Sequence, residues 1–130
     1  MKTKMILILI AATFLGSCVQ EEHLKTVTFK VDVNGIENVQ KVGLRGQMTD
    51  PSWQVTVPMT DDNNDGIYEV TLSKKTAING FEFKFLKNEE DYELSGQNNR
   101  IIQLEYKPET IVYEAIFNKP EGKQKRLENK

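Results

Sequence analysis

Residues 81–100 read FEFKFLKNEEDYELSGQNNR, and the first five alternate strictly between aromatic and charged side chains. In a β-strand, successive side chains point to opposite faces of the sheet. The three phenylalanines are therefore predicted to lie in a core, while Lys84 faces water. The polar loop that follows is expected to bring an aromatic residue, Tyr92, and an amide, Asn99, toward the surface that carries Lys84.

The same period of two recurs from residue 26 onward and is interrupted at short intervals by turn residues. This pattern is typical of an all-β sandwich or barrel. No helical period is sustained in the same part of the chain, which argues against an α/β fold. We expect eight strands, at residues 27–33, 39–45, 52–57, 67–72, 81–86, 92–94, 100–105 and 110–117.

The N-terminal residues carry the features of a secretion signal. Lys2 and Lys4 precede an apolar run at residues 5–14, and the run ends in Leu-Gly-Ser-Cys at residues 15–18. This apolar segment is too short to span a bilayer, which takes about 20 residues in a helix. We therefore expect residues 1–17 to be removed as a signal peptide.

The tetrapeptide that ends this segment resembles the bacterial lipobox, in which the signal is cut just before a cysteine that is then acylated. Cys18 is the only cysteine, so no disulfide can form within the chain. The resemblance implies a lipid anchor, such as palmitate, on Cys18; the other interpretation is a secreted protein with an unpaired thiol. Glu21 and Glu22 resemble the acidic tether of Bacteroidetes-type lipoproteins, which implies an outer-membrane lipoprotein at the periplasmic or the cell-surface face.

The rest of the chain is predicted to form one domain with two unstructured ends. Residues 18–25 are expected to be the lipidated cysteine and its tether, residues 26–118 the sandwich, and residues 119–130 a disordered charged tail in which nearly every residue is polar or charged. Removal of the signal takes away two lysines and changes the net charge from −2 to −4. An acidic chain offers no basic face, which excludes nucleic acid as a partner class.

Several short motifs occur in a familiar order: TVTFKVDV from residue 26, VGLRG from residue 42, a tryptophan at 53, FEFKF from residue 81, a Tyr-Glu pair from residue 92 and Asn-Arg from residue 99. In this order they resemble the starch-binding module, carbohydrate-binding module family 20, and its relatives among immunoglobulin-like glycan-binding domains. The resemblance covers most of residues 26–117. It implies an immunoglobulin-like β-sandwich of about seven to eight antiparallel strands.

The resemblance also implies a sugar site. In that family, one site uses a tryptophan after the second strand, the lysine of the aromatic strand, a tryptophan followed by glutamate, and the asparagine of Asn-Arg. The matching carbohydrate-binding residues are Trp53, Lys84, Tyr92 and Asn99, and Tyr92 offers a smaller ring than the family's tryptophan. The family's second sugar site has no counterpart that can be placed in this chain.

Each of these residues also has a structural interpretation. Trp53 is in register with two valines of its predicted strand, so a core position is an equal alternative. In the structural interpretation, Lys84 is a solvated lysine on a strand, and Tyr92 covers the edge of the core. Arg100 is interpreted as structural, pairing with a nearby carboxylate to hold its loop.

The residue types support a sugar site without the resemblance. A pyranose ring presents C–H groups that pack on an aromatic ring, and two rings set at an angle suit the curved chain of an α-1,4-glucan. Lys84 and Asn99 supply hydrogen-bonding groups for vicinal hydroxyls. We predict non-catalytic binding of starch- or glycogen-like α-glucan by a membrane-anchored lipoprotein, alongside other glycan-utilisation proteins. The alternative is a lipid-anchored protein–protein interaction domain with the same fold and no glycan binding.

The stretch DDNNDG at residues 61–66 matches the first half of a calcium loop, D-x-[DN]-x-[DN]-G. The twelfth position, however, is Leu72, where the motif requires a glutamate. A hairpin loop explains the composition, because Asp, Asn and Gly tolerate positive φ and bond their own backbone. We expect no metal site, no cofactor and no catalytic residues, since the only histidine, His23, lies in the predicted tether and the carboxylate run at residues 89–91 is typical of a solvated loop.

Overall fold

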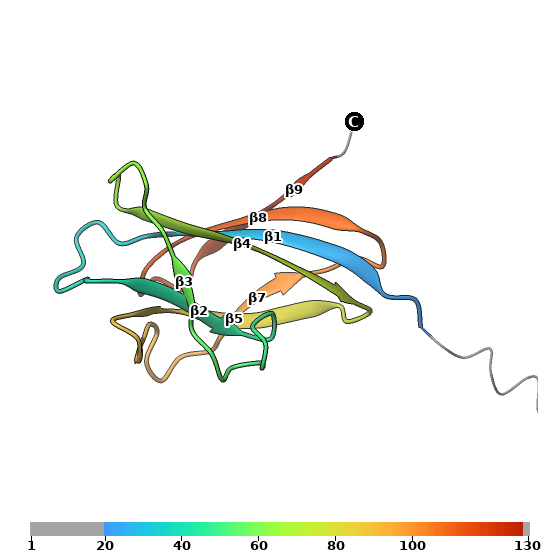
Figure 1. The fold of residues 1–130 in the computed structure, drawn as a ribbon, viewed down its shortest axis with the longest axis horizontal. Helices are drawn as coiled ribbons and strands as arrows, with labels where there is room; N and C mark the ends of the chain where they lie inside the picture. Colours follow the sequence, from blue (N-terminus) through green and yellow to red (C-terminus); the bar gives the residue numbers. More distant parts are fainter. Residues whose placement is uncertain (1–19, 129–130) are drawn as a thin grey trace, which may run out of the picture.

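The computed structural model describes residues 20–128, which form two β-sheets and no helix (Figure 1). The prediction of an all-β sandwich is confirmed. None of the described residues belongs to a helix long and apolar enough to cross a membrane. The strands are β1 (His23–Asp32), β2 (Val42–Gly46), β3 (Val57–Met59), β4 (Ile67–Thr76), β5 (Gly80–Lys87), β6 (Asp91–Tyr92), β7 (Arg100–Gln103), β8 (Glu109–Ile116) and β9 (Gly122–Leu127).

One sheet has the order β4-β1-β8-β9, and the other runs β3-β2-β5 and continues into two short strands. Both short strands pair with β5, β6 near its C-terminal end and β7 near its N-terminal end. The chain between β6 and β7 therefore forms a loop at the edge of this sheet. This loop carries Asn99, and β5 and β6 carry Lys84 and Tyr92.

The core lies between the two sheets and follows from the alternation in β1 and β5. Phe83 is its centre, with edge-to-face contacts at ring-centroid distances of 4.9 Å to Phe29, 4.9 Å to Tyr113 and 5.5 Å to Phe85. Edge-to-face pairs add to the gain from burial because the positive ring edge meets the negative ring face. The prediction that the phenylalanines of β5 are core residues is confirmed, since Phe81, Phe83 and Phe85 are all buried.

The predicted strands differ from the structure in three details. The described chain has nine strands, and β1 and β8 are parallel neighbours, so the sandwich is not wholly antiparallel. Parallel neighbours need a long crossover connection, and here the whole second sheet lies between β1 and β8 along the chain. The strand predicted at residues 52–57 is also wrong: a turn occupies most of it, and β3 begins only at Val57. Pro58 is tolerated in β3 because this strand is an edge of its sheet.

The predicted ends of the domain require correction as well. β1 begins at His23, inside the predicted tether at residues 18–25, and Lys25 is buried in an ion pair with Glu109 at 2.8 Å. The interpretation of residues 119–130 as disordered is wrong for residues 122–127, which form β9 against β8. A polar edge strand is stabilised by backbone hydrogen bonds and by partners such as Glu109, which also accepts from Arg126. Cys18 and the predicted signal peptide lie outside the described residues.

Candidate functional site

The outer face of the five-stranded sheet carries a group of polar and aromatic side chains. Arg45 of β2 and Lys84 of β5 lie directly opposite each other in register. Their neighbours along the strands, Leu44 and Phe83, are buried. Alternation therefore directs Arg45 and Lys84 to the same outer face of the sheet.

Tyr92 lies on this face too. It is opposite Leu86, two residues beyond Lys84 on β5, and so projects from the same side. Its hydroxyl accepts a hydrogen bond from Nη1 of Arg45 at 3.3 Å, and the guanidinium carbon of Arg45 lies 5.8 Å from the ring centroid. The residue remains 37% exposed, so a ligand can reach the ring.

Arg45 is held on its other side by Thr56. The Thr56 hydroxyl accepts a hydrogen bond from Nε of Arg45 at 2.6 Å. Gly43 makes room for Thr56, because a Cβ at position 43 would lie 2.3 Å from the Thr56 methyl group. Two of the five guanidinium N–H donors are used in this way, which leaves three for a ligand. We refer to Arg45, Thr56, Lys84 and Tyr92 as the polar face.

The ammonium group of Lys84 ties the polar face to the loop between β6 and β7. Nζ donates hydrogen bonds of 3.0 Å to the carbonyls of Leu94 and Gln97. The lysine is therefore half-buried and structural in part, not simply solvated as the alternation predicts. An ammonium group has three donors, so one remains for a ligand.

Asn99 lies at the end of this loop and lines a hollow of about 490 Å³. Three side-chain amides are among its lining residues, and the neighbouring Arg100 is buried. Amides offer both donors and acceptors, as sugar hydroxyls require. The residues that line it are Leu94, Gly96, Gln97, Asn98, Asn99, Arg100 and Pro120.

The loop is fixed at its base by a buried ion pair. The Nε and Nη2 atoms of Arg100 donate to the two carboxylate oxygens of Glu93 at 2.7 and 2.8 Å. The same guanidinium donates to the carbonyls of Ile116 and Lys119, and the Glu93 carboxylate accepts from the backbone N–H of Asn118. The pair therefore links the loop to the end of β8.

The interpretation of Arg100 as a structural residue is confirmed. Burial lowers the pKa of its guanidinium, but the hydrogen bonds and the charge of Glu93 outweigh this and hold the pKa above its ordinary value. The buried partner, Glu93, was missed from the sequence. Its signal is the alternation with Tyr92: when the tyrosine points outward, the next side chain points inward.

Trp53 lies in the turn after β2, outside any strand, and is half-buried. Its φ is 63°, a left-handed conformation that bulky residues rarely adopt. The carbonyl of Gly46 holds the turn by accepting hydrogen bonds from the Trp53 N–H at 3.0 Å and from the Thr49 hydroxyl at 2.8 Å. Strained residues that their surroundings fix in place cluster at binding sites. The core position that the strand register allowed for Trp53 is wrong.

The structure brings three of the four predicted site residues into one region. Lys84 and Tyr92 share the polar face, and Lys84 holds the loop that carries Asn99. No described contact joins Trp53 to them. Its anchor, Gly46, is however the neighbour of Arg45 on β2, so the backbone of Trp53 lies within roughly 10 Å of β5.

Arg45 is the member of the polar face that the sequence analysis missed. A signal was available, because Arg45 follows Leu44 in VGLRG and the alternation sends one of the two residues outward. Its contact with Tyr92 could not be read from spacing, since the two residues meet only through the register of β5 with both β2 and β6.

The loop at residues 61–66 uses its carboxylates for its own backbone. Asp61 accepts from the N–H groups of Asp65 and Gly66 at 3.2 and 2.9 Å. Asp65 accepts from the N–H of Ile67 at 2.9 Å, and this hydrogen bond lowers the pKa of its carboxyl. These are the contacts of a hairpin loop. Within residues 20–128, no three His, Cys, Asp or Glu side chains gather as a metal site would require.

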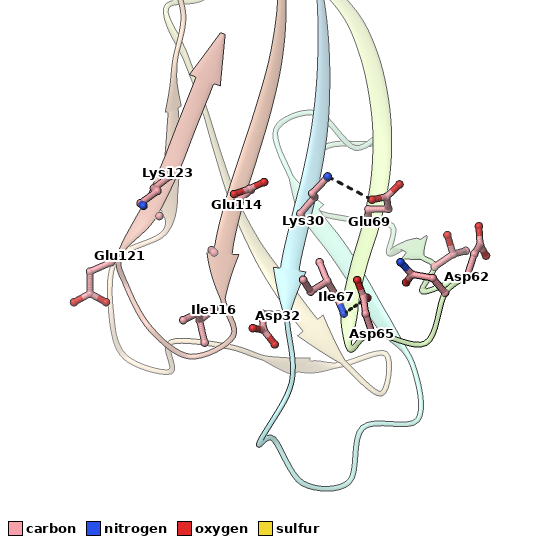
Figure 2. A pocket seen from close by; sticks show the side chains of 14 residues that line it. Lys30, Asp32, Asp62, Asp65, Ile67, Glu69, Glu114, Ile116, Glu121 and Lys123 are labelled. Carbon is pink, nitrogen blue, oxygen red and sulfur yellow. Dashed lines mark hydrogen bonds and ion pairs between the residues drawn. The ribbon is translucent and has the colours of Figure 1, made fainter. Parts of the chain in front are cut away.

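A second hollow, of about 700 Å³, lies over the outer face of the four-stranded sheet (Figure 2). Lys30 and Glu69 cross it as an ion pair at 3.8 Å, and Ile67 and Ile116 form its apolar part, 37% and 43% exposed. Six carboxylates and two lysines line it, but none of the described residues in its wall is aromatic. It therefore lacks a stacking platform for a sugar.

No protein-family model matches the chain, and no curated protein matches it. Among solved structures, the chain is similar to the solution structure of CBM25-2 of a beta/alpha-amylase from Paenibacillus polymyxa. The two are 16% identical, the TM-score is 0.48, and the similarity covers 83% of this chain and 97% of that chain. Proteins this distant can share a fold and differ in function, so function depends on the side chains described above.

Proposed function

We propose that the protein is a non-catalytic lipoprotein that binds α-glucan chains of the starch or glycogen type through the polar face. The observation that supports this most is the exposed ring of Tyr92, which Arg45 holds over the sheet beside Lys84. The ring is the stacking platform. The cations and the amide of Asn99 surround it with hydrogen-bonding groups.

The chemistry of these groups suits a neutral polyhydroxylated ligand. A sugar C–H face packs on the tyrosine ring by apolar burial and weak C–H to π contacts. Three N–H groups of Arg45 and one of Lys84 remain free to donate to hydroxyl oxygens, since the others already bond Thr56, Tyr92, Leu94 and Gln97. Because these groups are held in place before binding, little side-chain entropy is lost when the sugar arrives.

Trp53 supplies a second platform in this proposal. The turn that carries Trp53 follows β2, which pairs with β5, and the hydrogen bonds to the Gly46 carbonyl hold this turn in place. Two rings on separate segments contact successive residues of a curved chain better than those of a flat one. This favours α-1,4-glucan over cellulose.

The affinity is expected to be modest. Each sugar–protein hydrogen bond in a wet site contributes about 0.5–1.5 kcal/mol, and a stacked ring contributes a similar amount. A few such contacts correspond to a Kd on the order of 0.1–1 mM for a short oligosaccharide. A polysaccharide that engages several copies of the domain binds more tightly through multivalency.

Affinity electrophoresis in a gel that contains amylopectin tests the proposal. The protein is the chain from residue 18 with Cys18→Ser, whose hydrophobic core lies entirely between Val27 and Phe117. Retardation of the wild type is expected, with loss of retardation in Tyr92→Ala and retention in Tyr106→Ala, a matched change at a 60% exposed tyrosine far from the polar face. Absence of wild-type retardation, together with capture of one stoichiometric protein partner, would favour the interaction domain instead.

The lipid anchor is a separate part of the proposal and rests on the lipobox resemblance at Cys18. Metabolic labelling with a palmitate analogue is expected to mark the wild-type protein in an outer-membrane fraction and to leave Cys18→Ser unlabelled. Equal labelling of the two proteins would refute an anchor at this position.

A further inference from the structure

The end of the sandwich at which β1 begins carries an unusual number of exposed apolar side chains. They come from four different segments: the start of β1, the turn after β4, the loop after β7 and the end of β9. Such residues, when gathered, mark an interaction surface. We call this group the apolar end, and it consists of Leu24, Ile78, Tyr106 and Leu127, which are 47%, 44%, 60% and 42% exposed.

Strand register shows that these side chains share one end of the molecule. His23 is opposite Thr76, which places the turn that follows β4 beside the start of β1. The ring of Tyr106 lies 4.6 Å from that of His23, and its hydroxyl accepts a hydrogen bond from the backbone N–H of Glu21 at 2.8 Å. Leu127 is opposite Thr110, at the start of β8. In Figure 1 the start of β1, the tip of β4 and the start of β8 meet at the right.

Exposed charges of both signs surround the apolar end. Lys75 is opposite Leu24, and Lys125 lies on the same face of β9 as Leu127. Lys107 pairs with Glu105 at 3.0 Å, and Glu21, Glu22 and Glu128 are exposed carboxylates of the same end. The apolar side chains, and not a net charge, therefore distinguish this end of the molecule.

The position of the candidate lipid anchor also favours a membrane as the partner of this end. Cys18 precedes His23 by five residues. Even fully extended, this segment spans at most about 18 Å, so an acylated Cys18 would hold the apolar end close to the bilayer. Tyrosine has a polar hydroxyl on an apolar ring, and lysine has a long apolar stem. Both side chains favour the interface between lipid and water.

We propose that the apolar end is a membrane-docking surface that lies in the interface between lipid and water. Leu24, Ile78, Tyr106 and Leu127 enter the interfacial layer, and the exposed Lys75 and Lys125 beside them contact lipid phosphates. The orientation of the anchored protein rests on the proposed acylation of Cys18, but the surface itself acts without the lipid. Docking in this way turns the 88–91 loop and the neighbouring Tyr92 away from the membrane.

Flotation with vesicles tests this surface separately from the anchor and from glycan binding. The chain from residue 18 with Cys18→Ser is mixed with vesicles of equal parts phosphatidylethanolamine and phosphatidylglycerol, at low ionic strength. We expect binding that falls about tenfold or more in the double variant Leu24→Ser, Leu127→Ser. The matched control is Ile116→Ser, which removes a 43% exposed apolar residue from the opposite end of β8 and is expected to bind like the wild type.

Three results would overturn the inference: no wild-type binding to these vesicles, equal binding by the double variant, or an equal loss in the Ile116→Ser control. Unchanged circular dichroism and an unchanged urea midpoint verify that the double variant is folded. Its retardation by amylopectin is expected to equal that of the wild type, so a failure of docking and a failure of glucan binding are separate results. A milder variant, Tyr106→Ser, tests the same surface if the double variant does not fold.

Discussion

Arg45 decides how the ring of Tyr92 is presented, because its guanidinium bridges the ring and the hydroxyl of Thr56. A lysine at this position keeps the charge but cannot form both hydrogen bonds. We expect Arg45→Lys to weaken binding of a malto-oligosaccharide by about threefold to tenfold, nearly as much as Arg45→Ala. Isothermal titration calorimetry measures both, and a wild-type affinity in Arg45→Lys would show that the guanidinium geometry is unimportant.

Lys84 has two functions that one substitution separates. Lys84→Met keeps the apolar stem and removes the hydrogen bonds to the carbonyls of Leu94 and Gln97. A hydrogen bond from a charged donor contributes about 1.5–3 kcal/mol to stability. We therefore expect Lys84→Met to lower the free energy of unfolding by an amount of that order. Hydrogen exchange at residues 94–98 should accelerate more than exchange in β1. Unchanged exchange in this loop would contradict the positioning function of the lysine.

Residue-level prediction from the sequence succeeded where one strand's alternation was sufficient. Lys84 and Tyr92 are on the outer face, as the period of two requires. The position of Trp53 could not be predicted, because its left-handed turn depends on hydrogen bonds to the carbonyl of Gly46 and produces no periodic pattern in the sequence. Arg45 was missed because its partner is set by strand pairing across the sheet.

At the scale of elements, the buried pair of Glu93 and Arg100 connects the loop before β7 with the end of β8. Removal of one partner leaves an uncompensated buried charge, which costs about 3–5 kcal/mol. We expect Arg100→Met to lower the free energy of unfolding by this amount, and the double variant Glu93→Leu, Arg100→Met to lose less. Urea unfolding provides the test, and a loss below about 1 kcal/mol in the single variant would contradict the structural assignment.

The loop before β8 has a pH-dependent contribution. The hydrogen bond from Lys107, the charge of Arg126 and the charge of Lys107 lower the pKa of the exposed Glu105 carboxyl below its ordinary value of 4.5. A group with a lowered pKa stabilises the folded chain above the ordinary value, and this contribution is lost as the pH falls through the lower one. The urea midpoint should therefore decline less between about pH 5 and pH 3 in Glu105→Gln than in the wild type. An identical decline in both proteins would contradict this.

The elements themselves were predicted well where side chains alternate and poorly where backbone hydrogen bonds alone form the strand. β1 and β5 alternate apolar and polar residues; β5 extends its predicted range by one residue at each end, and β1 begins four residues before its predicted start. β9 has only one large apolar residue, Leu127, so composition argued for disorder, yet its backbone completes the ladder of β8. The long-range pairing of β1 with β8 also has no local signal.

At the scale of the whole molecule, Tyr92 of the proposed glucan surface and the proposed membrane surface lie toward opposite ends, and the turn of Trp53 begins at Gly46, opposite Phe83 in the middle of β5. Tyr92 pairs near the C-terminal end of β5, beside loops that stand away from the start of β1. The ten residues of β1 span about 33 Å between the two ends. A lipoprotein docked through the apolar end would therefore hold the ring of Tyr92 away from the head groups.

The most direct test of the glucan site is a two-dimensional NMR titration of the ¹⁵N-labelled Cys18→Ser chain with a malto-oligosaccharide. The polar face predicts saturable shifts that cluster at Arg45, Thr56, Lys84, Tyr92 and Asn99, with an additional shift of the single tryptophan, Trp53. Shifts confined to the second hollow, which contains Lys30 and Glu69, would contradict glucan binding at the polar face, and so would the absence of shifts at millimolar sugar.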